Sequence, residues 1–453
     1  MPNIERITHY IHNFLYTVSR PRIAAALLSS IDTEKLTNSA AGTKLMTLGA
    51  LFTSGKLDEC IQLADQLDFN DIAPEERPLL ALIIFNKFYE HGLLNQQTSN
   101  SMKHLLVAIC PDELQAHTQG NDLPPQSSLI KLDYAHSISS AVNGAFFVGE
   151  FVLGPGTRKS EVGYRIQKAL SSHGWNVPLF PIEGVRSYSS ATPSDFAMID
   201  AFAFHQKPLD DIIDILSSLR RYFRKIIIVD FDVWAGKFND MLRSISYHID
   251  YIWGFTADWC LANEPDFRNR CVRFPYFGGF DQLDNIIEAP LDWNTCTFNF
   301  TGSVLSYNLN RIHWLLEFIH HRLPIEINIS NPEIDDGLDP LQSQHLYAQK
   351  LAFTHAAINL TTRKDSSRPA TGRSFEVVSL NRLLVQERCP VFHYYFLKGE
   401  HFFEFSDIEE LCTIFDFLKS HPKTAQTICS LGHQFYKERY SCKKLVEHIQ
   451  TFL

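Results

Sequence analysis

Two short groups of polar residues in the second half of the chain have types and spacing that could bind an anionic sugar donor. The first, Thr371-Gly372-Arg373-Ser374-Phe375-Glu376, places a cation three residues before a carboxylate, where a helix should follow the apolar run 356–360. Open α/β domains bind ligands at this carboxyl edge of the sheet, and a helix N-terminus offers free N–H groups to a phosphate. The plainer alternative is that Arg373 and Glu376 only cap the helix and pair across its first turn.

The second group is Thr301-Gly302-Ser303, which stands between an expected strand and a helix that carries Arg311. At such a turn Gly302 and Ser303 would let the backbone approach a diphosphate, and Arg311 would neutralise part of its charge. With Glu376 accepting hydrogen bonds from ribose hydroxyls, the two groups predict a pocket for a nucleotide-sugar donor. An ordinary connection between a strand and a helix is the alternative for this turn.

The residues that could act on an acceptor come earlier in the chain. His205 follows the apolar run 201–204, and Asp230 and Asp232 follow the run 226–229, so each could reach an acceptor hydroxyl as a general base. Paired carboxylates also suit a divalent cation. Because a complete second α/β series follows them, we expect catalysis without a metal and no cofactor besides the donor. The alternatives are a structural histidine and an aspartate that caps the next helix.

A basic loop beside a glycine-rich turn is a further candidate for the acceptor side. Lys159 lies next to the turn that contains Gly154 and Gly156, and its ammonium could meet a phosphate or carboxylate of the acceptor. A solvated surface loop is the alternative, since isolated surface charges often have no role.

The elements that must position these residues read as two α/β series behind a helical region. Apolar residues at helical spacing predict an all-α domain over 1–110, either a bundle or a degenerate tetratricopeptide-like array. Residues 111–140, rich in Pro, Gln and Ser, read as a linker. Alternating apolar runs and amphipathic segments then predict Rossmann-like, doubly wound domains over 141–285 and 286–430, and a C-terminal helix over 431–453.

The expected strands are 145–152, one that begins at 175–177, 201–204, 226–229, 251–255 and 271–274 in the first α/β domain, and 296–300, 325–329, 356–360, 382–386 and 402–405 in the second. The fold class is therefore α/β, with an all-α domain in front.

Composition excludes some classes of function. The formal net charge of −10 and a pI near 6.0 leave no basic surface of the kind that nucleic-acid binding needs. No run of about 18 apolar residues is present, which predicts a cytoplasmic protein, with a peripheral contact at the inner membrane surface as an alternative. The nine cysteines include no C-x-x-C pair, so we expect reduced thiols and no zinc.

From about residue 145 onward, the chain resembles two-domain GT-B glycosyltransferases of the group 1 type, and most closely the spore-maturation-protein-like branch. The matching residues are the hexapeptide at 371–376, Arg311 and the segments 229–234, 274–281, 299–303, 395–400 and 405–411. The resemblance implies that the second domain binds the donor, that the first binds the acceptor, and that a C-terminal helix crosses back to the first. It also implies that Glu376 holds the ribose and that Arg373 or Arg311 holds the diphosphate. A glycine-rich segment follows the signature glutamate in many relatives, whereas this chain has Ser379-Leu380-Asn381-Arg382.

The sequence therefore predicts an enzyme, a glycosyltransferase that moves a sugar from a nucleotide-diphosphate donor to a glycan, lipid-linked or protein acceptor. Two alternatives stay open, namely a non-catalytic protein that binds nucleotides or glycans, and a scaffold that works through its N-terminal helices. We expect no nucleic-acid partner, and those helices are where a membrane or protein partner would bind.

Overall fold

The computed structural model describes residues 77, 81, 85, 89, 92, 94–110, 129–139, 141–149, 161–188, 193–230, 236–254, 260–275, 291–302, 310–329, 340–361 and 370–453. The chain divides into two compact units. One includes the helices α7 (Gln96–Ile109) and α13 (Asn310–His320), and the other includes a six-stranded sheet together with strands β9, β10 and β11, described below.

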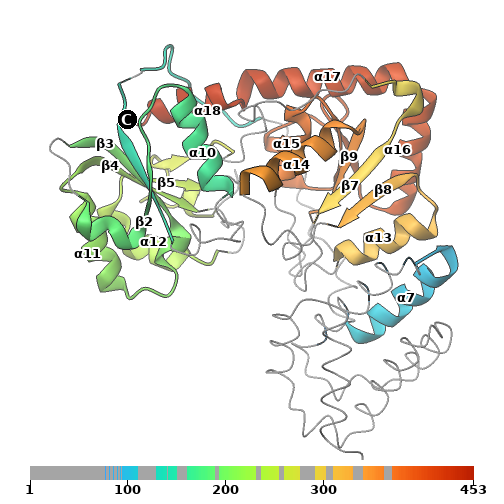
Figure 1. Ribbon diagram of the computed structural model, residues 1–453, viewed down its shortest axis with the longest axis horizontal. Coiled ribbons are helices and arrows are strands. Elements are labelled where there is room, and N and C mark those ends of the chain that lie inside the picture. Colours follow the sequence, from blue (N-terminus) through green and yellow to red (C-terminus); the bar gives the residue numbers. More distant parts are fainter. Residues whose placement is uncertain are drawn as a thin grey trace, which may run out of the picture. The chain divides into compact units, whose positions relative to one another are not determined.

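The first sheet has six strands in the order β2-β1-β3-β4-β5-β6 (Figure 1). Every neighbouring pair is parallel. The central strands are fully buried over most of their length, as their continuous apolar runs require of strands covered on both faces. The strands are β1 (Gly144–Val148), β2 (Leu179–Pro181), β3 (Ser194–Asp200), β4 (Phe223–Asp230), β5 (Tyr251–Gly254) and β6 (Cys271–Val272).

Helices and short 3-10 turns connect these strands. The helices are α10 (Glu161–Ser172), α11 (Leu209–Leu219) and α12 (Asn239–Ser244), and the 3-10 turns are η4 (Ile182–Ser187), η5 (Ala201–Phe204), η7 (Ser246–His248) and η8 (Cys260–Asn263).

The prediction of a strand over 201–204 was wrong. The strand is β3, which ends at Asp200, and the four apolar residues that follow form η5. The reason is a cap: Phe202 N donates to Asp200 Oδ1 at 2.9 Å, which turns the chain out of the sheet directly after the aspartate. A short apolar run fits a buried strand and a buried turn equally well, so periodicity alone could not separate the two.

The second sheet has five strands in the order β11-β10-β9-β7-β8. The pairs β7 with β9, β9 with β10, and β10 with β11 are parallel. The prediction of two Rossmann-like α/β sheets is therefore confirmed. The strands are β7 (Phe298–Gly302), β8 (Ile325–Ile329), β9 (Ala356–Asn359), β10 (Leu383–Glu387) and β11 (Phe403–Phe405), and the remaining elements are η9 (Trp293–Thr295), α14 (Pro340–Ala352), α15 (Gly372–Ser379), η11 (Pro390–Tyr394), α16 (Ile408–Ser420), α17 (Pro422–Arg439) and α18 (Cys442–Gln450).

The expected turn at 301–303 begins later than predicted. Thr301 and Gly302 are the last two residues of β7, and both are buried. Ser303 lies outside the described residues.

The helix α17 makes a close approach that only glycine permits. A Cβ atom added at Gly432 would lie 2.6 Å from the carbonyl oxygen of His401, a distance far inside van der Waals contact. Since that oxygen belongs to the backbone, it cannot swing aside. Gly432 therefore sets how closely α17 packs on the segment before β11.

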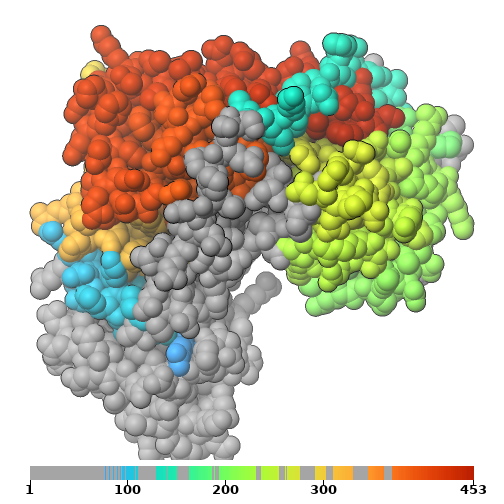
Figure 2. All heavy atoms as spheres, turned by 180° about the vertical axis from the view of Figure 1, so that it is seen from behind, coloured from blue at the N-terminus to red at the C-terminus, as the bar shows by residue number. Residues whose placement is uncertain are grey.

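The segment 129–139 is held against the helices α17 and α18. Tyr134 donates its hydroxyl proton to Arg439 O at 2.7 Å, and His448 Nδ1 donates to Asp133 O at 2.6 Å. Burial lowers the pKa of His448, which favours the neutral form of the ring. Figure 2 shows the teal atoms of this segment beside the red atoms of the C-terminal helices.

Helix α18 completes the packing of the first sheet. It lies against α10, and the ring of Phe452, just after α18, meets the ring of Tyr251 in β5 edge to face at 5.1 Å. Residues of α18 and of the first sheet therefore share one hydrophobic core.

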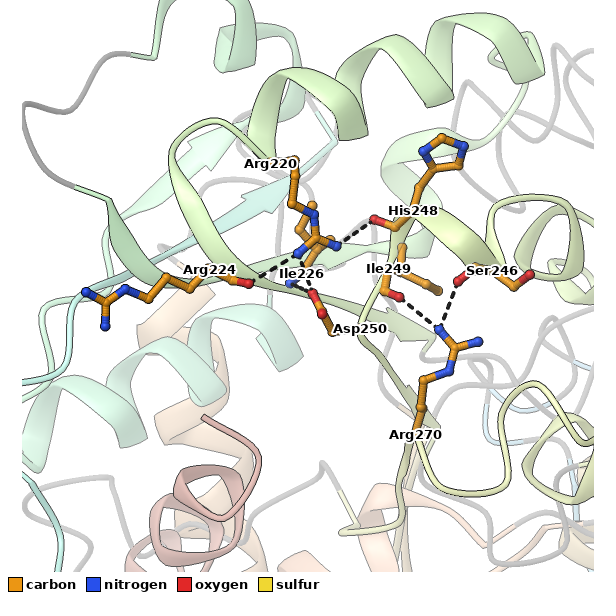
Figure 3. A network of polar contacts seen from close by, with 8 residues as sticks. All are labelled: Arg220, Arg224, Ile226, Ser246, His248, Ile249, Asp250 and Arg270. Carbon is orange, nitrogen blue, oxygen red and sulfur yellow. Dashed lines mark hydrogen bonds and ion pairs between the residues drawn. The ribbon is translucent and has the colours of Figure 1, made fainter.

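At the amino-terminal edge of the first sheet, arginines fix the starts of β4, β5 and β6 (Figure 3). Arg220 Nη1 donates to Asp250 Oδ2 at 2.7 Å, and the same oxygen accepts from Ile226 N at 2.7 Å. Arg270 Nη1 donates to two carbonyl oxygens, those of Ser246 and Ile249, at 2.9 Å each. This edge is a structural network, because its donors are used by backbone and side-chain acceptors of the protein itself.

The other compact unit contains a packed pair of helices. Helix α7 lies against α13, Lys103 pairs with Glu317, and His320 Nδ1 donates to Gln96 O at 3.0 Å. Most of the predicted all-α domain over 1–110 lies outside the described residues, so that domain stays a prediction, as do the predicted domain bounds. None of the described helices is long and apolar enough to cross a membrane.

Candidate functional site

The carboxyl edge of the second sheet carries a buried network of neutral polar side chains. Asn359, the last residue of β9, places its amide nitrogen 2.8 Å from both Thr371 Oγ1 and Ser374 Oγ, and 3.0 Å from Gln386 Oε1. Ser374 Oγ in turn donates to Gln386 Oε1 at 2.8 Å. Because buried polar groups are costly unless they are hydrogen-bonded, this network fixes the start of α15 against β9 and β10.

A second, charged cluster lies on α15 and its neighbours. Arg373 Nε donates to Tyr347 Oη at 2.9 Å, and the tyrosine hydroxyl donates to Glu376 Oε2 at 3.0 Å. The other carboxylate oxygen, Oε1, forms an ion pair with Arg165 Nη1 at 2.6 Å. The side chains of Arg165 and Glu376 are only 5% and 8% exposed, so this ion pair is largely desolvated.

The cluster joins α14, α15 and α10. Tyr347 comes from α14 and Arg165 from α10, which packs on both α14 and β1 of the first sheet. The Arg373 guanidinium also lies over the Phe300 ring of β7, at 5.7 Å from its centre. Residues of both predicted α/β domains therefore surround the carboxylate that the sequence singled out.

The plainer alternative for the hexapeptide does not describe what is found. Thr371 stands at the N-cap of α15, but its side chain makes no capping hydrogen bond and instead accepts from Asn359. Among the described contacts, Arg373 and Glu376 do not pair with each other and are bridged by Tyr347. Burial raises the pKa of Tyr347, which keeps its bridging proton in place.

Two residues of the hexapeptide point into the protein interior. Ser374 is fully buried in the Asn359 network. Phe375 is fully buried in an aromatic cluster, so it would serve a donor site by fixing α15. Its ring lies within 6 Å of the rings of Phe392, Tyr395, Phe396 and Tyr440.

The structure describes only some of the residues that the sequence predicted to bind the diphosphate. Thr301 Oγ1 donates to Asn299 Oδ1 at 2.5 Å, both on β7, and Gly302 closes that strand. Arg311 is the second residue of α13 and is 9% exposed. A guanidinium at the first turn of a helix adds its charge to the free N–H groups there.

The carboxyl edge of the first sheet carries two buried aspartates on adjacent strands. Asp200 ends β3 and Asp230 ends β4, and these residues are 2% and 0% exposed. Asp200 caps η5, the role that the sequence interpretation had offered as an alternative for Asp230. Sequence reasoning passed over Asp200, because the strand was placed after it.

His205 follows η5 and is exposed at this edge. Lys237 Nζ lies 3.3 Å from His205 Nε2. A lysine ammonium can only donate, so in this contact His205 Nε2 is the acceptor and carries a lone pair. The ammonium also lies over the rings of Phe202 and Phe238, at 5.1 and 5.6 Å from their centres. The single lone pair of Nε2 is therefore used by Lys237, and His205 could act as a general base only after Lys237 has moved away.

Five residues proposed from sequence lie outside the described residues: Asp232, Ser303, Gly154, Gly156 and Lys159. Within the described ranges, no group of three or more His, Cys, Asp and Glu side chains is arranged to hold a metal ion.

The structure adds residues to the site that sequence reasoning missed. Arg165 could have been recognised from the sequence, because it lies next to Ile166 on the buried stripe of α10 and a buried arginine needs a partner of opposite charge. Asn359 could also have been recognised, because it is a polar residue at the end of an apolar strand. Nothing in the sequence pointed to Tyr347 or Gln386, since a tyrosine in a helix and a glutamine in a strand are ordinary.

Comparison with known proteins bears on the same part of the chain. The family model described as "Glycosyl transferase-like" matches residues 311–451, a range that includes Tyr347, Asn359, Arg373 and Glu376. No curated protein sequence matches the chain.

Three solved structures are similar to the chain at low sequence identity. HepE from Anabaena in complex with UDP-glucose is 10% identical with a TM-score of 0.44, and the match covers 68% of this chain and 100% of that one. Sucrose-phosphate synthase from Thermosynechococcus elongatus is 9% identical with a TM-score of 0.46, covering 68% and 98%. A glycosyltransferase from Rickettsia africae is 9% identical with a TM-score of 0.45, covering 69% and 98%. The match over residues 311–451 confirms the prediction that the chain is a glycosyltransferase.

Proposed function

We propose that the chain transfers a sugar from a nucleotide-diphosphate donor to a glycan, lipid-linked or protein acceptor. The observation that carries this proposal is the cluster of Arg373, Tyr347 and Glu376 at α15, inside the range that matches the family model. It offers a guanidinium for a phosphate and an ionised carboxylate for sugar hydroxyls within one helical turn.

In the proposed reaction the protein stabilises the leaving diphosphate. Arg373 would pair with the phosphate oxygens, and Arg311, Gly302, Ser303 and the first N–H groups of α13 and α15 would add further donors. Charge grows on the diphosphate as the glycosidic bond breaks, so donors fixed before the reaction lower its barrier. Thr371 and Ser374 would act through the Asn359 network, which holds the start of α15.

On the acceptor side, His205 is the proposed base, with Asp230 and Asp232 as the other candidates. The His205 lone pair at Nε2, which accepts from Lys237, would take the proton of an attacking hydroxyl once the acceptor displaces Lys237. Gly154, Gly156 and Lys159 are proposed to contact the acceptor. We further propose a GT-B pairing of the two α/β domains, membership of the spore-maturation-protein-like branch, catalysis without a metal, and a cytoplasmic site of action.

The test is a panel of nucleotide sugars carrying uridine, guanosine, adenosine, cytidine and thymidine diphosphates. Donor binding should raise the melting temperature, because a ligand that binds only the folded state stabilises it. Release of free nucleotide in the presence of candidate acceptors should follow for the same donor. Stabilisation without turnover would favour a non-catalytic binding protein, and neither response with any donor would overturn the proposal.

A further inference from the structure

The donor and the acceptor of each hydrogen bond around Glu376 can be assigned. An arginine can donate but not accept, so Tyr347 Oη accepts from Arg373 Nε. The tyrosine proton must then point to Glu376 Oε2. Arg165 faces the other oxygen, Oε1, with a second positive charge. The two carboxylate oxygens of Glu376 therefore each face one protein partner.

The positions that stay available on this carboxylate match a vicinal diol. An ionised carboxylate has about four acceptor positions, two on each oxygen. Within the described part of the chain, Tyr347 donates to one position on Oε2, and Arg165 Nη1 faces Oε1 as an ion-pair partner at 2.6 Å. At least one position is therefore left on each oxygen. Two hydroxyls on adjacent carbons, such as the 2′ and 3′ hydroxyls of ribose, can donate to both oxygens together.

Stability alone is a weak explanation for the Arg165 and Glu376 pair. Taking both charges out of water costs several kcal/mol per ion, and an apolar pair of similar size is often equally or more stable. Arg165 also occupies a place on the buried stripe of α10, between Gly163 and Ile166, where an apolar residue would pack. What the arginine adds is a fixed orientation for Glu376.

We propose that Arg165 and Tyr347 are positioning residues that present Glu376 to the two ribose hydroxyls and so make the site specific for ribonucleotide donors over 2′-deoxy donors. The inference rests on the proposed function and deepens it. It also makes the donor site depend on a residue of the first α/β domain, which the resemblance assigned to the acceptor.

The experiment measures the dissociation constants of UDP, GDP, ADP and CDP, each beside its 2′-deoxy form, by titration calorimetry. The wild-type protein should bind the best ribonucleotide about 10-fold more tightly than the deoxy form, the value of one charge-assisted hydrogen bond. In Tyr347→Phe and in Arg165→Lys this ratio should fall to about 3-fold or less, because Glu376 is no longer held by the hydroxyl or by the planar guanidinium.

The control is Lys168→Met, which removes a positive charge from the same helix at a half-buried position. It should keep the wild-type ratio. Arg165→Met leaves a buried carboxylate unpaired and is expected to fold poorly, so the double variant Arg165→Met with Glu376→Gln replaces it. That variant should bind both nucleotide forms equally.

The outcomes separate the inference from the function on which it rests. A lower ratio in Tyr347→Phe and Arg165→Lys supports the inference. Equal weakening of the ribo and deoxy forms would show a purely structural role and overturn it, as would an unchanged ratio in folded variants. A wild-type protein that binds none of the nucleotides would overturn the proposed function itself.

Discussion

The carboxyl edges of the two sheets are built in contrasting ways. At the second sheet, Asn359, Ser374 and Gln386 hold one another inside the protein, and the charged cluster on α15 is tied together by Tyr347. At the first sheet, His205 is exposed and makes a polar contact with Lys237. The difference suggests a division of labour. One edge is preorganised for a charged ligand, and the other presents a reactive group to ligands of variable shape.

The largest expected effect is at Glu376. Glu376→Gln keeps the size of the side chain but removes the charge that faces Arg165, so we expect donor affinity to fall about 100-fold or more. Titration calorimetry with the best donor of the panel measures this loss. The matched control is Glu404→Gln, because Glu404 is also a buried carboxylate of the second sheet and pairs with His393 at 2.8 Å. The control should lose stability and keep its affinity, and equal affinities in the two variants would remove Glu376 from the site.

The next largest effect is expected at His205, at the carboxyl edge of the first sheet. His205→Ala should lower kcat about 100-fold, the usual contribution of a general base, and leave the donor dissociation constant unchanged. His248→Ala is the control, since His248 lies at the opposite edge of the same sheet and contributes its backbone oxygen to Arg220. If kcat is kept in His205→Ala, the base must be sought at Asp230 or Asp232. A loss of donor affinity instead would contradict the division between the two edges.

A smaller effect is expected at Asn359. Asn359→Ala removes the amide that joins Thr371, Ser374 and Gln386, so the free energy of unfolding should fall by about 1 to 3 kcal/mol in urea titrations. Donor affinity should fall about 10-fold, because the start of α15 loses its fixed position. Asn328→Ala, which removes a contact to Glu326 on β8, should change neither quantity. Lost stability with full affinity would show that the network serves the fold alone.

Much of the fold was predictable because strand and helix periods differ and the apolar runs are continuous. Strand β8 has the bounds that were expected, and strand β9 ends one residue earlier than expected. The exception, 201–204, failed because its four apolar residues suit both a strand and a turn. The decisive contact there is a side-chain cap by Asp200, which no periodicity reports.

Only those parts of the candidate site whose residues lie close together in the chain could be predicted from the sequence. The hexapeptide at 371–376 could be recognised as a helix start, and α15 begins within it. The partners of Glu376 could not be found in this way, since Arg165 and Tyr347 are remote in sequence and meet it through packing of α10, α14 and α15. The sequence shows which residues can make charged contacts, but tertiary packing decides which of them do.

The docking of α18 on α10 has a consequence for the order of events during synthesis. The strands β1 to β6 and the helix α10 leave the ribosome long before α18 does, yet α18 residues are part of the same hydrophobic core. Until α18 arrives, the face of α10 that it covers is exposed. Domains usually fold one after another as the chain emerges. Here the first α/β domain is expected to wait in an incomplete form for the second, which makes a nascent chain the state in which this protein most needs a chaperone.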